Sequence, residues 1–327
     1  MSEITELAVG PLPEGSSVVG IEQAEAFLFE KFGESVSNVV QVSGGAWSKA
    51  YMFQRDGVDF VLRFGGFVDD FEKDRLAQRF ASPELPIPAV VEIGQAVGGY
   101  FAISERAFGS FIDHLDGEQM RALLPSLFAM LDAARLVDLS ETTGWGGWDA
   151  NGNGFDATCE ASLLGIADEG DAEGRGGGWR QRLESSATGA GRFDEAFGYL
   201  KELVAFCPEE RHLIHSDLLH FNVLVEGDRI SAVFDWGCSR YGDFLYDVAW
   251  FAFWAPWYPA WREIDFAAEA ARHYAAIGLD VPHFAERLRC CMVHIGLDGQ
   301  RYQAFVGDWE ELERTAERTL LVARGEP

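Results

Sequence analysis

The segment HSDLLHFN, residues 215–222, gathers side chains that could carry out chemistry. Asp217 has a carboxylate that could accept or orient a proton, and Asn222 has an amide oxygen that could bind a cation. A second carboxylate, Asp235, follows a short apolar segment in VFDWG. Because hard cations such as Mg²⁺ bind oxygen ligands, these three residues could form a metal-dependent catalytic site.

The spacing in this segment resembles the catalytic loop of protein kinases, H-R-D-L-x-x-x-N, with Ser216 in place of the arginine. In that loop the aspartate faces the attacking hydroxyl and the asparagine contacts Mg²⁺. Asp235, followed by Trp236 and a glycine, stands where a kinase has D-F-G. The pattern predicts phosphoryl transfer to a hydroxyl, with Asp217 as the catalytic residue and Asn222 and Asp235 as Mg²⁺ ligands.

Two other kinds of site could use the same residues. His212, His215 and His220 are spaced by three and five residues, whereas a helical zinc pair needs both histidines on one face. A Ser–His–Asp hydrolase would need a G-x-S-x-G nucleophile elbow, which the sequence lacks. We therefore expect His215 to brace the loop from within rather than to bind a metal ion.

The segment DANGNGFDATCE, residues 149–160, has the residue types of an EF-hand calcium loop. However, Gly144, Gly146 and Gly147 disfavour the leading helix of an EF-hand, and Asp156 stands where an apolar residue is usual. No second loop of this kind is present in the sequence. We interpret the segment as a flexible loop rich in glycine and asparagine.

The elements that must position the catalytic residues fall into two predicted domains. Residues 1–105 should form an α+β lobe that binds the nucleotide, with a five-stranded antiparallel sheet and one inserted helix. Its strands are expected at 36–42, 50–54, 59–64, 88–94 and 99–105, and its helices at 21–32 and 69–82.

Residues 106–327 should form a mainly helical lobe that holds the catalytic residues and the acceptor. Apolar periodicity predicts helices at 118–139, 192–207, 244–254, 263–278, 284–307 and 309–324. Short strands should flank the catalytic segment at 212–214, 222–227 and 229–236. Pro125 should lie in the first turns of its helix or kink it, and the Gly-rich stretches 144–156 and 169–179 are expected to be loops.

The first predicted hairpin turn, in SGGAWSKA, could cover the phosphates of ATP. Its backbone N–H groups would come from Ser43, Gly44, Gly45 and Ser48. The turn does not match G-x-G-x-x-G, so by itself it would indicate an ordinary hairpin. It becomes a nucleotide-binding candidate because the catalytic pattern follows in the same chain.

Arg63, in FVLRFG, stands where kinases have the phosphate-binding lysine of V-A-I-K. Arginine binds phosphate bidentately and stays charged, so it could take this role, with Asp74 or Glu72 as its ion-pair partner. A strand-end arginine exposed to solvent is the simpler interpretation. The hinge between the lobes should lie in ISERAFG, where backbone groups of Glu105 and Ala107 would meet the adenine.

The composition restricts the possible partners. The 327 residues include 26 basic and 53 acidic residues, a formal net charge of −27. This charge disfavours binding to nucleic acids and to anionic membranes, whose phosphates attract Lys and Arg. It would attract a polycationic small molecule, although high solubility or adaptation to salt would explain the charge equally well.

The cysteines and apolar runs indicate a cytoplasmic protein that we expect to be a monomer. An odd number of five cysteines, two of them adjacent, does not suggest a disulfide framework. The first residues lack the features of a signal peptide. The longest apolar run, YDVAWFAFWAPWYPAW, is interrupted by prolines and too short to span a membrane.

With these motifs in place, the chain resembles the aminoglycoside phosphotransferases, which have the protein-kinase-like bilobal fold. The resemblance covers most of residues 25–310 and rests on segments that include DLSETTGWG, CPEERHLIHSD, NVLVEGDRISAVFDW, FWAPW and IGLDG. It implies ATP- and Mg²⁺-dependent phosphorylation of a cationic aminoglycoside, an activity that confers antibiotic resistance. The chain departs from the family pattern in residues 141–190 and at LLHF, within the catalytic segment.

The acceptor should bind beside Asp217, where His220 is a candidate contact. Trp254, Trp257 and Asp298 are further candidates, because aromatic faces and carboxylates suit a cationic sugar. Asp247 is a second possible partner of an ammonium group. We expect the neighbouring Trp250 and Phe253 to be core residues.

Two other functions remain open from the sequence. A kinase of another small hydroxylated molecule, such as a different antibiotic, an amino alcohol or a sugar, could have the same fold. A non-catalytic nucleotide-binding protein is a further possibility. It is disfavoured by Asp217, Asn222 and Asp235, since binding alone does not require all three.

Overall fold

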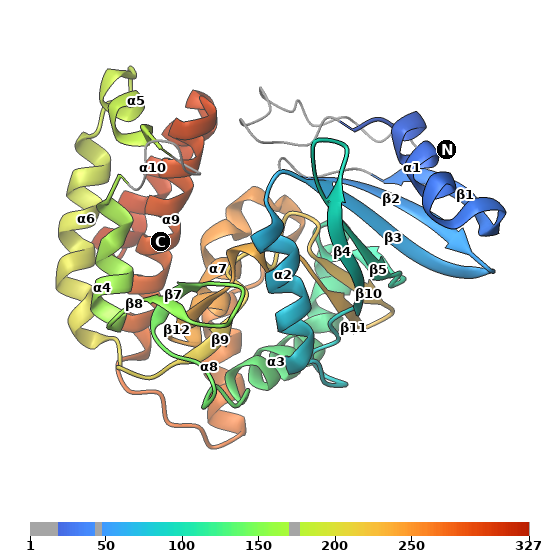
Figure 1. Cartoon of the computed structure of the whole chain (residues 1–327). Helices are drawn as coiled ribbons and strands as arrows, with labels where there is room; N and C mark the ends of the chain where they lie inside the picture. Colours follow the sequence, from blue (N-terminus) through green and yellow to red (C-terminus); the bar gives the residue numbers. More distant parts are fainter. Residues whose placement is uncertain (1–18, 43–47, 170–176, 327) are drawn as a thin grey trace. The chain divides into compact units, whose positions relative to one another are not determined.

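The computed structural model describes residues 19–42, 48–169 and 177–326, which form two compact units (Figure 1). The N-terminal unit comprises Met1–Arg79 and Pro88–Ala107, and the C-terminal unit comprises Phe80–Ile87 and Phe108–Pro327. Residues 80–87 belong to the C-terminal unit. In this segment the carbonyl of Pro86 accepts a hydrogen bond of 2.8 Å from the backbone N–H of Val233.

The N-terminal unit contains a five-stranded antiparallel sheet with strand order β1-β2-β3-β5-β4. This confirms the predicted sheet and the order of its elements along the chain. Its elements are α1 (Ile21–Phe32), β1 (Val36–Val42), β2 (Ser48–Arg55), β3 (Val58–Gly65), α2 (Val68–Ala77), β4 (Val90–Ala96) and β5 (Gly99–Glu105). Helix α2 ends earlier than predicted and continues as a 3-10 turn over Gln78–Phe80, since the residue before Pro83 is disfavoured in a helix.

The core of the N-terminal unit lies on one face of this sheet. Alternate residues of β3, Phe60, Leu62 and Phe64, are at most 7% exposed and pack with Tyr51 of β2 and Leu28 of α1. The two-residue side-chain period of a strand places the intervening residues on the opposite face. Arg63 therefore points away from this core, as a residue that binds a ligand should.

The C-terminal unit is mainly helical, as predicted. Its longer helices are α3 (Gly117–Arg135), α6 (Gly191–Leu203), α7 (Leu245–Trp254), α8 (Phe266–Ala276), α9 (Phe284–Val306) and α10 (Trp309–Arg324), and its shorter ones are α4 (Cys159–Leu164) and α5 (Trp179–Ser185). Pro125 lies in the middle of α3 rather than in its first turns, and the helix runs continuously through it.

Helix α9 packs against α6, α7 and α10 in this unit (Figure 1). Gly296 permits the close approach, because a Cβ there would lie 2.8 Å from the ring of Phe253 in α7 and would clash with Thr319 in α10. Cys290 and Cys291 of α9 are buried, which confirms their prediction as core residues. Among the described helices, none combines the length and apolarity needed to cross a membrane.

Two small sheets hold the catalytic segment. One has the strand order β11-β10-β6 and the other β8-β7-β12-β9. The strands are β6 (Ser110–Phe111), β7 (Trp145–Trp148), β8 (Gly154–Asp156), β9 (His212–Ile214), β10 (Val223–Glu226), β11 (Arg229–Val233) and β12 (Arg240–Gly242). Residues 215–222 thus connect the last strand of one sheet to the central strand of the other.

The Gly-rich stretch 144–156 is a β-hairpin, so its prediction as a loop was wrong. Strand β7 pairs with β8 on one side and with β12 on the other. Gly146 has φ 72°, and a Cβ at this position would clash with the side chains of Asp156 and Ser162. The glycine therefore permits close packing of a strand rather than chain flexibility. Of the second stretch, 169–179, residues 170–176 lie outside the described part.

Candidate active site

The loop from His215 to Asn222 has an unusual backbone. Ser216, His220 and Phe221 have φ values of 60°, 61° and 71°, in the left-handed region that residues other than glycine rarely adopt. Leu218 and Leu219 between them are fully buried and anchor the loop in the core. Strained backbone of this kind persists only where the surrounding structure holds it, and it is concentrated at functional sites.

His215 braces the loop, as predicted. Its Nδ1 accepts a hydrogen bond of 3.2 Å from the backbone N–H of Asp217, and its Nε2 donates to the carbonyl of Phe234 at 3.0 Å. Its ring also makes an edge contact with Trp236, with 4.7 Å between the ring centroids. The imidazole thereby ties Asp217 to the segment that carries Asp235.

Asp247 of α7 holds the start of the loop. Its two carboxylate oxygens accept hydrogen bonds of 2.9 and 2.8 Å from the backbone N–H groups of His215 and Ser216. Burial raises the pKa of Asp247 to about 6, although these two N–H groups act in the opposite direction. The carboxylate is only 3% exposed, so the prediction that Asp247 binds an ammonium group of the acceptor was wrong.

The carboxylate of Asp217 lies between two side chains of its own loop. Its Oδ1 is 2.9 Å from Nδ1 of His220, and its Oδ2 accepts a hydrogen bond of 3.1 Å from Nδ2 of Asn222. Desolvation opposes protonation of His220, although its side chain is 55% exposed. The hydrogen bond to Asp217 and the charges of Asp217, Asp113 and Glu311 outweigh this and raise the pKa of the imidazole. The structure therefore brings three of the predicted site residues together.

The two residues predicted to hold Mg²⁺, Asn222 and Asp235, lie on backbone segments that are joined by a hydrogen bond. Nδ2 of Asn222 donates hydrogen bonds to Asp217. The amide oxygen Oδ1 of Asn222 therefore faces away from Asp217. The backbone N–H of Phe234 donates a hydrogen bond of 3.1 Å to the backbone carbonyl of Asn222. Asp235 is the next residue after Phe234, so it directly follows this hydrogen bond along the chain. No group of three or more His, Cys, Asp or Glu suited to a metal occurs in the described ranges. One carboxylate and one amide oxygen are nevertheless enough for Mg²⁺, which keeps waters and shares phosphate oxygens.

Comparisons with known proteins identify the type of enzyme. The family described as "Phosphotransferase enzyme family" matches residues 38–285. The chain belongs to this family. Hygromycin-B 4-O-kinase of Escherichia coli is 37% identical to it over 286 residues, which cover 86% of this chain and 79% of that protein.

Solved structures of the aminoglycoside phosphotransferase APH(4)-Ia have the same fold as this phosphotransferase. One has a TM-score of 0.82 and 32% identity, and the match covers 94% of this chain and all of that one. A thermostable mutant in ternary complex with AMP-PNP and hygromycin B has a TM-score of 0.81 and 33% identity, with 92% and 98% covered. These findings confirm the predicted kinase-like fold and the resemblance to aminoglycoside phosphotransferases.

The aromatic residues predicted to contact the acceptor differ in their accessibility. Trp250 and Phe253 are buried, which confirms that they are core residues. Trp254 is only 7% exposed, with its ring 6.0 Å from that of His220. Trp257 is half-buried, and its indole N–H donates to Glu311. Asp298 is exposed on α9, so its contact with an acceptor stays a prediction.

In the N-terminal unit of the phosphotransferase, Arg63 forms an ion pair with the buried Asp74 of α2. The guanidinium also lies over the ring of Phe71, 5.2 Å from its centroid. This identifies Asp74 as a partner of Arg63, whereas Glu72, the other candidate, pairs with Arg75. A buried carboxylate thus holds Arg63 in a fixed orientation, as phosphate recognition requires.

The other nucleotide-binding candidates are less defined. Ser43, Gly44 and Gly45 lie outside the described residues, and Ser48 is the first residue of β2, paired with Gly65 in β3. The N–H of Glu105 donates to the carbonyl of Ala89 at 2.9 Å. This N–H is therefore already used within the unit, and the contacts of Glu105 and Ala107 with an adenine stay predictions.

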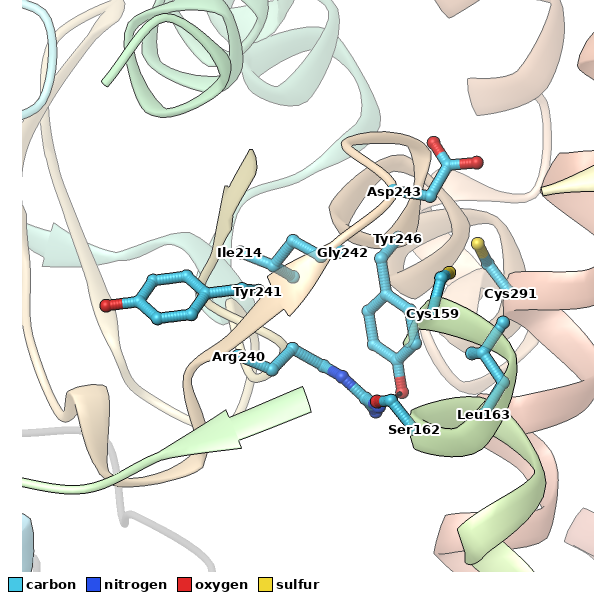
Figure 2. A pocket seen from close by; sticks show the side chains of 10 residues that line it. All are labelled: Cys159, Ser162, Leu163, Ile214, Arg240, Tyr241, Gly242, Asp243, Tyr246 and Cys291. Carbon is cyan, nitrogen blue, oxygen red and sulfur yellow. Dashed lines mark hydrogen bonds between the residues drawn. The ribbon is translucent and has the colours of Figure 1, made fainter. Parts of the chain in front are cut away.

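A small cavity lies apart from these residues (Figure 2). Arg240 of β12 projects along it and donates to the hydroxyls of Ser162, at 2.9 Å, and Tyr246, at 3.3 Å. Tyr246 also contacts Nδ1 of His294 at 2.9 Å, and burial with the nearby Arg240 and Arg301 lowers the pKa of that histidine. This network joins β12, α4, α7 and α9.

The EF-hand-like segment comprises the turn of the β7–β8 hairpin, strand β8 and the start of α4. Oδ1 of Asp149 accepts hydrogen bonds of 2.9 Å from the backbone N–H groups of Asn151 and Asn153. The bond to Asn153 makes the largest contribution to lowering the pKa of Asp149. A strand, β7, leads into the segment, whereas an EF-hand has a helix there. The polar residues therefore serve the turn itself.

Asp113 and Tyr258 contact the catalytic loop and were missed from the sequence. The backbone N–H of His220 donates to Asp113 although 107 residues separate them. Neither residue belongs to a motif or a spacing that predicts such a contact. Only the pairing of β6, which precedes Asp113, with β10 after the loop brings them together.

Proposed function

We propose that this phosphotransferase transfers the γ-phosphoryl group of ATP to a hydroxyl of hygromycin B or a closely related aminoglycoside. The observation that supports this most is the carboxylate of Asp217, which lies between the imidazole of His220 and the amide of Asn222. The similarity to a hygromycin-B 4-O-kinase supports the acceptor and its 4-hydroxyl. The expected consequence for a cell is resistance to this antibiotic.

Asp217 acts on the acceptor hydroxyl. His220 and Asn222 each donate to one carboxylate oxygen, and each oxygen has a further lone pair that can accept a hydrogen bond from the hydroxyl. The two donors fix the plane of the carboxylate, so the hydroxyl is aimed before it reacts. Proton acceptance at such a position contributes roughly 10²–10⁴ to the rate.

Asn222 and Asp235 hold Mg²⁺ in this proposal. When bound, the ion supplies positive charge that neutralises the developing charge on the transferred phosphoryl group. Asn222 presents its amide oxygen because its amide nitrogen is bonded to Asp217. The same amide therefore connects the metal ligand to the catalytic carboxylate, which explains why a side chain with both a donor and an acceptor stands at this position.

In the N-terminal unit, Arg63 contacts the α- and β-phosphates of ATP. Its ion pair with Asp74 restricts the guanidinium to one orientation. The backbone of Glu105 and Ala107 meets the adenine in this proposal, and of the hairpin turn predicted to cover the phosphates only Ser48 belongs to the described residues, while Ser43, Gly44 and Gly45 lie outside them.

The acceptor is a polycation, and this chain suits it electrostatically. A formal net charge of −27 raises the local concentration of a cationic antibiotic around the protein, most strongly at low ionic strength. His220, Trp257 and Asp298 supply the individual contacts, and the buried Trp254 supports the imidazole of His220, 6.0 Å from its ring. We also propose that the enzyme is a cytoplasmic monomer, in keeping with an odd number of cysteines, two of them adjacent, which does not suggest a disulfide framework.

Mass spectrometry of hygromycin B after incubation with the enzyme, ATP and Mg²⁺ tests this function. We expect the mass of one added phosphoryl group, with fragmentation placing it on the 4-hydroxyl. Parallel incubations with other aminoglycosides measure selectivity. ATP consumption with a non-aminoglycoside alcohol, and none with any aminoglycoside, would instead identify a kinase of another small molecule.

A further inference from the structure

Asp113, in the 3-10 turn Ile112–His114, makes three hydrogen bonds beside the catalytic loop. Its Oδ1 accepts from the backbone N–H of His220 at 2.9 Å, and its Oδ2 accepts from the backbone N–H of Phe221 at 3.0 Å. The hydroxyl of Tyr258 donates to Oδ1 at 2.8 Å. Both oxygens of this half-buried carboxylate are therefore committed to the loop and to the tyrosine.

The two backbone groups that Asp113 binds belong to residues in a strained conformation. His220 and Phe221 have φ values of 61° and 71°. Successive backbone N–H groups in a turn can converge and form a concave binding site for an anion. Here the carboxylate of Asp113 is that anion, so it stabilises a backbone that the two side chains disfavour.

The turn held by Asp113 lies between the catalytic aspartate and the residue proposed as a metal ligand. His220 contacts Oδ1 of Asp217 at 2.9 Å, and Asn222, one residue after the turn, contacts Oδ2 at 3.1 Å. A change in the backbone of the turn would therefore move both donors that orient the carboxylate of Asp217.

The other end of the loop is held in the same way. Asp247 accepts the N–H groups of His215 and Ser216, and Ser216 also has a positive φ of 60°. Each end of the loop thus presents two consecutive N–H groups to one carboxylate. The recurrence indicates that the loop depends on both carboxylates for its shape.

Tyr258 stabilises the charge of Asp113. Burial and the charge of Asp113 raise the pKa of the tyrosine, so its hydroxyl stays protonated and donates. The hydrogen bond from Tyr258 is the third one that the carboxylate of Asp113 accepts. It also connects the segment after α7 to the loop.

We propose that Asp113 is a positioning residue for phosphoryl transfer, which acts by holding the turn at His220 and Phe221 so that His220 and Asn222 orient Asp217. The proposal rests on the proposed function, because it assigns the residue to the same reaction. Nothing in it requires Asp113 to touch the acceptor or the nucleotide.

Kinetic measurements on Asp113→Ala and Asp113→Asn test the proposal. In the first variant both N–H groups lose their acceptor. In Asp113→Asn, the remaining side-chain oxygen can still accept from one of the two N–H groups. The new NH₂ group faces the other N–H and cannot accept a hydrogen bond from it. We expect kcat with hygromycin B to fall about 100-fold in Asp113→Ala, as for a misplacement of catalytic groups by about 1 Å, and less in Asp113→Asn. KM for ATP should change little.

Asp116→Ala is a matched control. Asp116 lies three residues further along the chain, and its carboxylate also accepts two backbone N–H groups, those of Glu118 and Gln119, at 2.9 Å each. These bonds cap α3. We expect a lower melting temperature from this variant but an unchanged kcat at temperatures where it is folded.

Hydrogen–deuterium exchange gives a second measurement that needs no enzyme activity. In Asp113→Ala, exchange should rise in the peptide that contains residues 217–223 and stay unchanged in the helices α9 and α10. In Asp116→Ala it should rise at the start of α3 only. This keeps the proposal testable for variants or substrates that give no turnover.

The outcomes separate the two claims. A parent enzyme that leaves hygromycin B unmodified contradicts the proposed acceptor, and exchange at 217–223 then still decides the role of Asp113. An active parent whose Asp113 variants keep the parental kcat contradicts the positioning role. So does a loss of kcat in Asp113→Ala no larger than that in Asp116→Ala at a matched folded fraction, or unchanged exchange at 217–223.

Discussion

Strand β3 in the N-terminal unit and the catalytic loop in the C-terminal unit position their functional residues in different ways. Arg63 lies in a regular ladder, where β3 pairs along its length with β2 and β5. Asp217 lies in a loop with positive φ angles, held by Asp113 and Asp247 from distant parts of the chain. A regular strand together with one ion pair, to Asp74, is enough to aim a single cation. A carboxylate that needs a donor on each oxygen requires irregular backbone and long-range anchors.

Beside the catalytic loop, in the segment that His215 ties to it, Asp235→Ala should have a large effect. Loss of a Mg²⁺ ligand removes charge stabilisation worth several kcal/mol, so kcat should fall by roughly 10³. Steady-state kinetics over a range of Mg²⁺ concentrations measures this. Asp228→Ala removes an equal charge from the exposed turn between β10 and β11 and should leave kcat unchanged. Equal effects of the two changes would contradict the assignment of Asp235.

Removal of the anchor in α7 tests how far the loop depends on distant residues. Asp247→Ala leaves the buried N–H groups of His215 and Ser216 without their acceptor. Unsatisfied buried donors cost about 1–3 kcal/mol each, so we expect the free energy of unfolding to fall by roughly 3 kcal/mol. Urea denaturation measures the change, and a loss below about 0.5 kcal/mol, typical of surface substitutions, would be inconsistent with an anchoring role.

The same carboxyl should make stability depend on pH. Its pKa is raised to about 6 in the folded protein, so the folded state binds this proton more tightly than the unfolded state. The contribution of Asp247 to stability is therefore largest below pH ~4 and declines as the pH rises from ~4 to ~6. The stability of Asp247→Asn relative to the parent should improve over this range, and an unchanged difference would contradict the raised pKa.

Substitution of Arg63 in strand β3 should have a smaller effect on catalysis. In Arg63→Ala the guanidinium beside Asp74 is lost, and we expect KM for ATP to rise about tenfold, equivalent to about 1.4 kcal/mol of binding. Arg63→Lys keeps the charge but loses the planar guanidinium that can donate two parallel hydrogen bonds. Its KM for ATP should therefore lie between those of the parent and Arg63→Ala. Nucleotide titration calorimetry checks both variants. If Arg63→Ala binds ATP as tightly as the parent does, Arg63 has no role in phosphate binding.

The smallest effect concerns strain that serves no catalytic purpose. Val97 and Gly98 form the turn between β4 and β5, with φ values of 52° and 77°. Asn–Gly suits such a turn, and a β-branched residue does not. Val97→Asn should stabilise the protein by up to about 1 kcal/mol and leave kcat unchanged. A destabilised variant in thermal unfolding would show that the strain at Val97 is compensated by packing.

Regular elements could be predicted from the sequence, and irregular ones could not. The bounds of α1, β1 and β5 follow from local apolar periodicity and turn residues. Hairpin β7–β8 was missed because glycines that permit close packing have the same appearance in a sequence as glycines in a loop. Strand β12 was missed because Arg240–Gly242 combines a charged residue with a glycine and contains no apolar run, whereas the equally short β9 contains Leu213 and Ile214.

The residues of the candidate site also fall into those that the sequence predicts and those that it does not. His215, Asp217 and Asn222 lie in one octet, and Asp235 follows after one hairpin, so spacing along the chain predicts them together. The anchors Asp113 and Asp247 act on backbone N–H groups, which every residue has. A sequence therefore carries no signal for such contacts, and Asp247 was assigned wrongly to the acceptor for this reason.

Rapid-quench measurement of a single turnover in Asp217→Ala tests the account most directly. With Mg²⁺, ATP and hygromycin B, we expect phosphoryl transfer to slow by roughly 10²–10⁴, while calorimetry shows unchanged binding of Mg²⁺-ATP. A transfer rate within about tenfold of the parent, a difference of only about 1.4 kcal/mol in the barrier, would contradict the assignment of Asp217 as the catalytic residue.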